Sequence, residues 1–350
     1  MSYIGPIRKA LAEQVIDVDL SNNTNPFLGN MAEYPDVLQT NLKKNYCEII
    51  GQMNLPMGLY GTDTLSPENI LFTVGSCEGI DLLLRSFAEP NQDQIIVTDP
   101  SFPAYEHWGL IHNLKVKKIP LRGENYNRLS VPDILKEKSS MLFLCNPNNP
   151  TSTVLDLDIL EELCMTYKGL LVVDEAYIEF SDIPSLVHQI HRFKNLVVLR
   201  TLSKAWGLAA ARCGAVIAHP SVINTLRYVQ IPFGFCSPSQ EIVRERCDHP
   251  DMMFESWKKI REERDILVEK LSDHDSVERI LPSHSNFIFV ILKDFERTTR
   301  ELQVNKIFVV DCSRQIPNGI RVTVGTREEN EAFLTCVAGT ELKAGELLSG

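Results

Sequence analysis

The sequence lacks the long apolar segment of a membrane protein, because none of its apolar runs approaches the roughly 18 residues that span a bilayer. Its first ten residues contain no signal-peptide core, so we expect a cytoplasmic protein. Basic charge is not in excess, since 46 acidic residues outnumber 35 lysine and arginine residues and the net charge is -11. This balance argues against nucleic acid and an anionic membrane surface as partners, although a local arginine can still bind a small anionic substrate.

The sequence also lacks a group of cysteine and histidine residues at a spacing typical of a metal site. Its nine cysteines include no C-x-x-C pair, and we expect them to be reduced thiols, most of them small core residues. His188 and His191 lie three residues apart on a possible helix, but no carboxylate or cysteine set completes a site there. We therefore expect no metal ion.

The chain contains no internal repeat or low-complexity tract, and its 350 residues are enough for a large domain and a smaller one. In its middle part, short apolar runs alternate with helical patterns such as 78–87 and 157–167. The runs that look like strands are 95–98, 114–119, 141–145, 169–173, 195–199 and 214–218. Several are apolar throughout, as in a sheet covered on both faces. This alternation predicts an α/β domain with a doubly wound, mostly parallel sheet.

A long charged amphipathic stretch, 250–271, is expected to lead out of the large domain. Two further strand patterns, 285–292 and 319–324, follow it with helices around them, which predicts a small α+β domain. The irregular N-terminal residues are expected to pack on that small domain. We therefore predict a large domain over residues 30–245 and a small domain formed by residues 1–29 and 246–350.

Four segments follow predicted strands and could form a ligand site, because ligands of open α/β sheets bind at the carboxyl ends of the strands. The first runs from Gly75 through Ser76 and Cys77 into a helix, whose free N–H groups could hold a phosphate. An ordinary helix cap is the alternative interpretation. In the second segment, prolines on both sides of Asn149 fix the backbone and would point its amide into a cleft, unless the segment is a plain turn.

The third segment places Asp174 at the end of a buried strand, where a carboxylate is costly unless it meets a cation. A protonated pyridine nitrogen would be such a cation. Tyr177 lies about one helical turn further on and would present its hydroxyl to the same pocket. A magnesium-binding carboxylate of the Walker B type is the alternative, but the sequence has no G-x-x-x-x-G-K-[ST] loop to accompany it.

The fourth segment contains Lys204, which follows the apolar run 196–199. If that run is a buried strand, we expect Lys204 to be a buried amine with a lowered pKa, able to form a Schiff base with an aldehyde. A solvated lysine at a helix start is the alternative. Arg212 lies eight residues on and could bind an anionic group beside it. The spacings between Asn149, Asp174 and Lys204 each fit one helix and one strand, so these side chains can meet at one edge.

Taken together, these segments resemble the fold type I aminotransferases that use pyridoxal phosphate. The resemblance is carried by Asn149-Pro-Thr, Asp174-Glu-Ala-Tyr177, and Ser203-Lys204 followed by Arg212. The longer stretches 174–180, 200–205 and 321–329 are similar to histidinol-phosphate aminotransferases, and the likeness covers nearly the whole chain. It implies a pyridoxal-phosphate transferase fold for the large domain and pyridoxal phosphate as the cofactor.

The resemblance also implies a role for each matching residue. Lys204 would bind the cofactor covalently and move a proton between substrate and cofactor, while Asp174 would pair with the ring nitrogen. Asn149 and Tyr177 would hydrogen-bond the phenolic oxygen, and Phe102 would stack on the ring. The phosphate would be bound by Ser203, Arg212 and the N–H groups of Ser76 and Cys77.

Three further residues concern the substrate and the partner subunit. Tyr34 resembles a tyrosine that reaches across a dimer interface to the neighbour's cofactor phosphate, which implies a homodimer. Arg321 would bind the anionic group of the substrate, and Asn25 lies in the segment that usually closes over it. The sequence departs from the family pattern at Phe102, where tyrosine is frequent, and at Ser152, where glycine is usual. We expect Ser152 to perturb a turn rather than the chemistry.

The resemblance specifies the reaction more closely than the substrate. Histidinol-phosphate aminotransferases commonly carry a phosphate-binding arginine where this chain has Val310, and Arg314 is a candidate replacement. The main prediction is transamination between histidinol phosphate and 2-oxoglutarate in histidine biosynthesis. The alternative is another enzyme of this cofactor class, an aromatic or other amino-acid aminotransferase or a phosphothreonine-type decarboxylase. A non-catalytic sensor of this fold is a third interpretation, but we expect no helix-turn-helix before Asn22.

Overall fold

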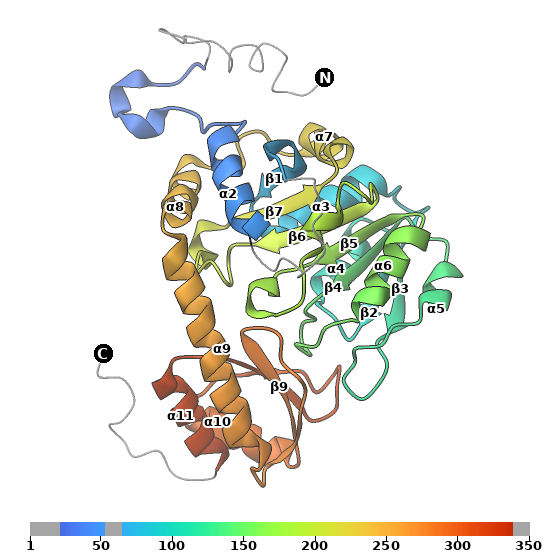
Figure 1. Ribbon diagram of the computed structural model, residues 1–350, viewed down its shortest axis with the longest axis vertical. Helices are drawn as coiled ribbons and strands as arrows, with labels where there is room; N and C mark the ends of the chain where they lie inside the picture. Colours follow the sequence, from blue (N-terminus) through green and yellow to red (C-terminus); the bar gives the residue numbers. More distant parts are fainter. Residues whose placement is uncertain (1–21, 53–64, 339–350) are drawn as a thin grey trace.

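The computed structural model describes residues 22–52 and 65–338, and two β-sheets organise it (Figure 1). The larger sheet has seven strands in the order β1-β7-β6-β5-β4-β2-β3. Their bounds are β1 (Ile70–Thr73), β2 (Gln94–Asp99), β3 (Lys115–Pro120), β4 (Met141–Cys145), β5 (Leu170–Asp174), β6 (Leu196–Thr201) and β7 (Gly214–Ala218). Only β7 runs antiparallel to its neighbours in this sheet. The predicted α/β fold with a mostly parallel sheet is confirmed.

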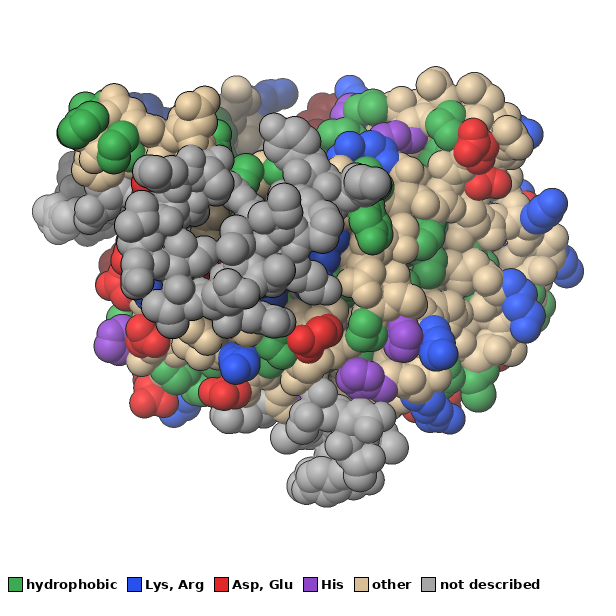
Figure 2. All heavy atoms as spheres, turned by 90° about the horizontal axis from the view of Figure 1, so that it is seen from above, with side chains coloured by type: hydrophobic (Ala, Val, Ile, Leu, Met, Phe, Trp, Pro, Cys, Tyr) green, Lys and Arg blue, Asp and Glu red, His purple; other side chains and the backbone are tan. Residues whose placement is uncertain are grey.

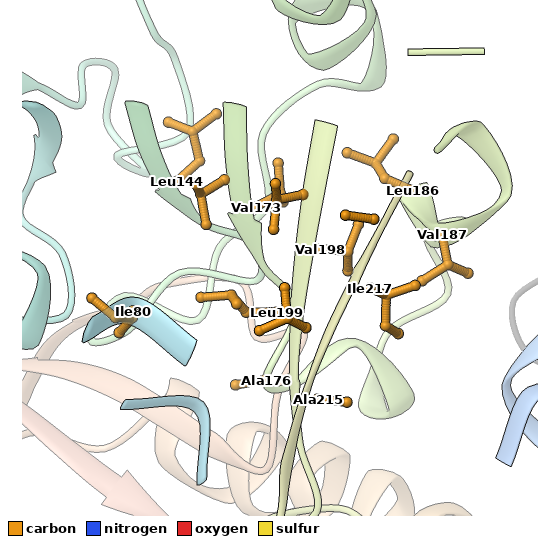
Figure 3. Close-up of a cluster of buried hydrophobic side chains, with 14 of the residues drawn as sticks. Ile80, Leu144, Val173, Ala176, Leu186, Val187, Val198, Leu199, Ala215 and Ile217 are labelled. Carbon is orange, nitrogen blue, oxygen red and sulfur yellow. The ribbon is translucent and has the colours of Figure 1, made fainter. Parts of the chain in front are cut away.

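The central strands are apolar along their whole length because helices and loops cover both faces of the large sheet. The helices of this part are α3 (Gly75–Phe87), α4 (Ala104–Ile111), α5 (Val131–Leu135), α6 (Leu157–Thr166) and α7 (Pro220–Val229). Figure 3 shows Leu144, Val173, Val198 and Ile217 from neighbouring strands in one buried cluster, with Val187 packed beside them. Burial of this apolar surface stabilises the edge of the sheet on which the polar segments lie.

The smaller sheet has four antiparallel strands in the order β10-β11-β9-β8 and its own apolar core. Its elements are β8 (Val277–Ile280), β9 (Phe287–Leu292), α10 (Phe295–Val304), β10 (Val310–Asp311), β11 (Gly319–Thr323) and α11 (Arg327–Val337). After α8 (Ser237–Asp248), the long helix α9 (Pro250–Ser272) leads to this sheet (Figure 1). Arg264 on α9 donates to the carbonyl oxygens of Phe180 and Ser285, which ties the helix to both parts. The exact domain boundaries stay a prediction.

The N-terminal arm, residues 22–38 with η1 (Pro26–Leu28) and η2 (Asn30–Ala32), precedes α2 (Thr40–Gln52). In Figure 1 residues 22–32 lie at the opposite end of the molecule from the small sheet, so the expected packing of 1–29 on the small domain is not seen for the described residues 22–29. The arm is held instead near α8, where Gln240 donates to the carbonyl oxygen of Asp36. Residues 1–21 lie outside the described part of the chain.

The outer surface of this arm is apolar. Phe27, Leu28 and Met31 are 91%, 76% and 70% exposed. Figure 2 views the molecule from this end and shows hydrophobic side chains on the surface at the left, the side on which Figure 1 places the arm. Within residues 22–52 and 65–338, no helix combines the length and the apolar character needed to cross a membrane.

Candidate active site

The polar segments singled out from the sequence meet at one edge of the large sheet. Because β1, β2, β4, β5 and β6 are parallel to one another, their carboxyl ends share that edge, and the antiparallel β7 begins there. The register places Cys145 beside Asp174 and Thr201 beside Gly214. Loops that are far apart in the sequence are thereby brought within reach of a single ligand.

Asp174 is buried at the end of β5, with 2% of its surface exposed. The Tyr105 hydroxyl donates to Oδ2 at 2.8 Å, and the backbone N–H of Ala176 donates to Oδ1 at 3.1 Å. Burial raises the pKa of Asp174 to about 6, against the opposing effect of these two hydrogen bonds. No cation of the described residues forms a salt bridge with this carboxylate. A cationic ligand atom would supply the missing charge.

Asn149 connects the large sheet to the small one. Its Nδ2 donates to the Tyr177 hydroxyl at 3.2 Å, and its Oδ1 accepts from Nη1 of Arg321 at 2.6 Å. The Tyr177 ring meets the Phe287 ring edge to face at 5.0 Å. The Arg321 guanidinium lies over the Phe287 ring, 5.2 Å from its centre. Because Arg321 comes from β11 and Phe287 from β9, the small sheet contributes a cation to this edge.

Lys204 follows β6, and its side chain is exposed. The expectation of a buried amine is therefore wrong, because β6 ends at Thr201 and Lys204 lies beyond the buried strand. The pKa of Lys204 is nevertheless lowered, first by partial desolvation and then by the positive charges of Arg321 and Arg212. Two guanidinium groups, each able to bind an anion, are thus close enough for their charge to act on the amine.

Arg212 forms a cradle for an anion together with the start of α3. Its backbone has φ +50°, and Nη1 donates to the carbonyl oxygen of Ala209 in η6 (Ala209–Ala211). Gly75 has φ +72°, which favours glycine, and a Cβ there would lie 2.9 Å from Nη2 of Arg212 and would push the guanidinium away from this helix start. Ser76 and Cys77 follow in the first turn and are half-buried. Free N–H groups of a helix start beside a guanidinium fit a phosphate.

The residues present at this edge fit pyridoxal phosphate. The cradle at Arg212 suits its phosphate, and the buried carboxylate of Asp174 suits a protonated ring nitrogen. Phe102 is half-buried beside them and meets Tyr105 edge to face at 5.6 Å. Ser203 is half-buried, and its backbone N–H donates to the Thr201 hydroxyl. In the described part of the chain, no group of three or more His, Cys, Asp or Glu side chains could hold a metal ion.

Tyr34 and Asn25 are not brought to this cluster by the fold of one chain. Tyr34 is 52% exposed and stacks on Phe233 at 4.3 Å. The side chain of Asn25 caps η1 by accepting from the backbone N–H of Phe27. Arg314 is exposed, and its charge helps to lower the pKa of Asp311. The charges that lower the pKa of Lys204 are those of Arg321 and Arg212. The role of Arg314 as a replacement for the arginine absent at 310 stays a prediction.

Sequence reasoning missed two aromatic residues of the site. Tyr105 lies three residues after Phe102, about one helical turn, and this spacing was a signal that could have found it. Phe287 had no comparable signal, because its proximity to Tyr177 depends on how the small sheet meets the large one.

Ser152, which replaces the glycine usual in related sequences, keeps a positive φ of 63° and is fully buried. Its hydroxyl hydrogen-bonds those of Ser283 and Ser285, and its carbonyl oxygen accepts from the backbone N–H of His284 at 2.9 Å. The turn therefore keeps the conformation that glycine favours, while the added hydroxyl bonds the segment that leads into β9. The sequence could not predict these contacts, because Ser152 and its partners lie more than 130 residues apart in the chain.

Replacing Asp174 with asparagine is expected to stabilise the cofactor-free protein while impairing its activity. The native pKa of about 6 lies above the ordinary 3.8, so the buried charge lowers the unfolding free energy increasingly as pH rises from 3.8 to 6. The asparagine side chain carries no charge, and above pH 6 we expect a gain on the order of 2 kcal/mol. Urea unfolding at pH 7 and pH 4 measures it, and the gain should shrink at pH 4. A less stable variant at pH 7 would contradict this expectation.

Comparison with known proteins shows likeness over most of the chain. Residues 15–337 match the family described as aminotransferase class I and II. The histidinol-phosphate aminotransferase of Bacteroides thetaiotaomicron is 33% identical over 330 residues, which are 92% of this chain and 90% of that protein.

Two crystal structures show the same fold. That of the histidinol-phosphate aminotransferase from Clostridium acetobutylicum has a TM-score of 0.77 at 22% identity and covers 89% of this chain and 91% of its own. The enzyme of the same name from Sinorhizobium meliloti, in complex with pyridoxal-5'-phosphate, has a TM-score of 0.76 at 20% identity and covers 89% and 84%.

Proposed function

Since this chain belongs to the aminotransferase class I and II family and is a pyridoxal-phosphate-dependent aminotransferase, we propose that it transfers the amino group of histidinol phosphate to 2-oxoglutarate. The resemblance drawn from the sequence is thereby confirmed at the level of the family. The observation that carries the proposal is the 2.6 Å hydrogen bond from Nη1 of Arg321 to Oδ1 of Asn149, which brings a cation of the small sheet to the edge of the large sheet where Arg212 and Lys204 lie. One arginine faces the cofactor cradle, and the other comes from the small sheet as an anchor for substrate.

We assign roles to the residues around the cofactor in accordance with this geometry. When bound, pyridoxal phosphate supplies the carbonyl group that takes up the amino group and the ring that withdraws electrons from the substrate carbon. Asp174 would keep a proton on the ring nitrogen, and Asn149 and Tyr177 would donate to the phenolic oxygen. Phe102 would stack on the ring, and the phosphate would be bound by Ser203, Arg212 and the N–H groups of Ser76 and Cys77.

Lys204 would carry the proton during the reaction. Its lowered pKa keeps a larger share of the amine neutral near pH 7, and a neutral amine can accept the proton that leaves the substrate carbon. Arg321 would bind the phosphate of histidinol phosphate in one half-reaction and a carboxylate of 2-oxoglutarate in the other. A single guanidinium can serve both because it forms paired hydrogen bonds with either anion.

A spectral assay tests the substrate. The protein is purified with pyridoxal phosphate, its visible absorbance is recorded, and histidinol phosphate is added without any 2-oxo acid. We expect the visible band to disappear and imidazole acetol phosphate to form in stoichiometric amount. If the band is unchanged by histidinol phosphate but disappears with another amino acid, histidinol phosphate is not the substrate, while the assignment as an aminotransferase still holds.

Val310 supports a second candidate, another enzyme of the same cofactor class. It lies on β10 directly opposite Arg321 on β11 and is 42% exposed, so the substrate anchor has an apolar neighbour. An aromatic or other amino-acid aminotransferase, or a phosphothreonine-type decarboxylase, is then the alternative. Products distinguish them, because a decarboxylase releases carbon dioxide while an aminotransferase forms glutamate.

Replacing Val310 with arginine is expected to strengthen binding of phosphorylated substrate. A second guanidinium beside Arg321 can add a charge-assisted bond to the phosphate, and we expect the KM for histidinol phosphate to fall roughly tenfold. The KM for unphosphorylated histidinol should change little. Val304→Arg is the matched control, because it adds the same charge at an exposed position on α10. An equal change in KM for histidinol phosphate and for histidinol would contradict the proposal that Arg321 binds the substrate phosphate.

We propose that the active unit is a homodimer in which Tyr34 reaches the cofactor phosphate of the partner. The apolar surface of the N-terminal arm supports this, since Phe27, Leu28 and Met31 are exposed in a single chain. Asn25 lies in the same arm and would approach the substrate of one of the two sites. Sedimentation should give twice the chain mass of 39.6 kDa, and a monomer with full activity would reject the proposal.

We further place the enzyme in the cytoplasm. All nine cysteines are free thiols, eight of them with a pKa raised by burial and none in a disulfide, as expected in a reducing compartment.

A further inference from the structure

Tyr105 is the one side chain of the described residues that hydrogen-bonds Asp174. It lies in the first turn of α4, is fully buried, and donates its hydroxyl to Oδ2 at 2.8 Å. Its ring stacks on Phe143 of β4 at 5.3 Å and meets Phe102 edge to face at 5.6 Å. Packing from two sides therefore fixes the direction in which the hydroxyl points.

This hydrogen bond acts on the charged form of Asp174. A donor to a carboxylate stabilises the ionised state, whereas burial favours the protonated state. The pKa of Asp174 is raised by burial and held down first by the Tyr105 bond and then by the N–H of Ala176. With no salt bridge to Asp174 in the described part of the chain, Tyr105 is its main support as an anion.

We propose that Tyr105 is a positioning residue that, through its bond to Oδ2 of Asp174, determines whether the shared proton lies on the cofactor's ring nitrogen or on the carboxylate. The inference rests on the proposed binding of pyridoxal phosphate beside Asp174. A carboxylate that keeps its tyrosine donor is a weaker base and leaves the proton on the ring. Without the donor it becomes a stronger base, takes more of the proton, and the ring withdraws electrons less well.

Tyr105→Phe is the main test, because it removes the hydroxyl and keeps the ring against Phe143 and Phe102. Tyr167→Phe is the matched control. Tyr167 is also buried, and its hydroxyl is hydrogen-bonded to that of Ser139 at 2.7 Å. Ser139 precedes β4 and Tyr167 precedes β5, so this pair lies at the edge of the sheet opposite to Asp174. Both variants lose one buried hydroxyl, and only Tyr105→Phe loses it at Asp174.

The first readout uses the cofactor-free protein. Because the native pKa of Asp174 lies above its ordinary value, the unfolding free energy should fall as pH rises through 3.8 to about 6 and then level off. In Tyr105→Phe the fall should continue beyond pH 6, because the carboxyl group holds its proton longer. Tyr167→Phe should lower the curve equally at every pH. A uniform offset in Tyr105→Phe would reduce its role to packing and overturn the proposal.

The second readout uses the loaded enzyme. We expect Tyr105→Phe to lower kcat by about ten- to a hundredfold, as for loss of a bond to a charged group, with KM changed less than twofold. The pH dependence of the visible absorbance should shift in the same variant, and 3-fluorotyrosine at 105, a stronger donor, should shift it the opposite way. Equal changes in kcat and KM, or no spectral shift, would overturn the proposal. A wild type that binds no pyridoxal phosphate would instead overturn the proposed function.

Discussion

Replacing Lys204 with alanine is expected to lower the rate of amino transfer by roughly four orders of magnitude or more, because the variant loses both its nucleophilic amine and its proton carrier. In the fold, Lys204 follows β6, and its pKa is lowered first by partial desolvation and then by the charges of Arg321 and Arg212. Glutamate formation from amino donor and 2-oxoglutarate measures the loss.

Two controls separate the amine from its charge. Lys204→Arg keeps the positive charge, but a guanidinium does not lose its proton at neutral pH, so we expect it to be as inactive as the alanine variant. Small amines added to Lys204→Ala should restore part of the activity, because they can act as proton carriers in the space left behind. The cradle at Arg212 and Gly75 is unaltered, so the variant should still bind pyridoxal phosphate. Full activity in Lys204→Ala would exclude the proposed mechanism.

Replacing Arg200 with methionine is expected to have the largest effect on stability, lowering the unfolding free energy by about 3–5 kcal/mol. Arg200 lies on β6 and is 1% exposed. Its guanidinium pairs with Glu175 at 3.1 Å and with Glu179, in η4 (Ile178–Phe180), at 3.0 Å, and it donates to the Ser185 hydroxyl at 2.9 Å. Without the arginine, two buried carboxylates face each other with no cation.

The matched control is Arg327→Met, because Arg327 also pairs with a glutamate, Glu263, at 2.7 Å but at the surface. Exposed pairs contribute little, so we expect a loss of at most about 1 kcal/mol there. Urea unfolding at pH 7 measures both variants. Adding Glu175→Gln and Glu179→Gln to Arg200→Met should recover part of the loss, since it removes the unpaired charges. Equal losses in the two single variants would show that the buried cluster contributes no more than a surface pair.

Arg200 illustrates what a local pattern leaves out. The segment from 200 to 205 reveals the relationship to aminotransferases, yet nothing in it says that this arginine joins the chain after Asp174 to the chain before Lys204. Tyr105 is a milder case, since its spacing of three residues from Phe102 was a signal that the sequence offered. Its bond to Asp174 required the parallel order of β2, β4 and β5 to be known.

The sequence by itself determined the type of fold and predicted which polar residues would gather at one edge of the sheet. Apolar runs alternating with helical patterns required a sheet buried on both faces, because only such a sheet shields strands like 141–145 and 214–218 from water. Polar residues directly after those strands had to gather at one edge, since parallel strands end on the same side. Asp174 and Asn149 therefore lie at that edge, as their spacing predicted, whereas Lys204 follows its strand but is not buried.

Only the tertiary structure decided what surrounds these residues. It left Lys204 exposed, brought Arg321 of the small sheet to 2.6 Å from Asn149, gave Asp174 a buried tyrosine donor, and left the N-terminal arm apart from the small sheet. The physical reason is that burial, electrostatic coupling and hydrogen-bond direction depend on distances between segments that lie far apart in the sequence. Local periodicity reports which face of an element is apolar, but it carries no information about which other element will cover that face.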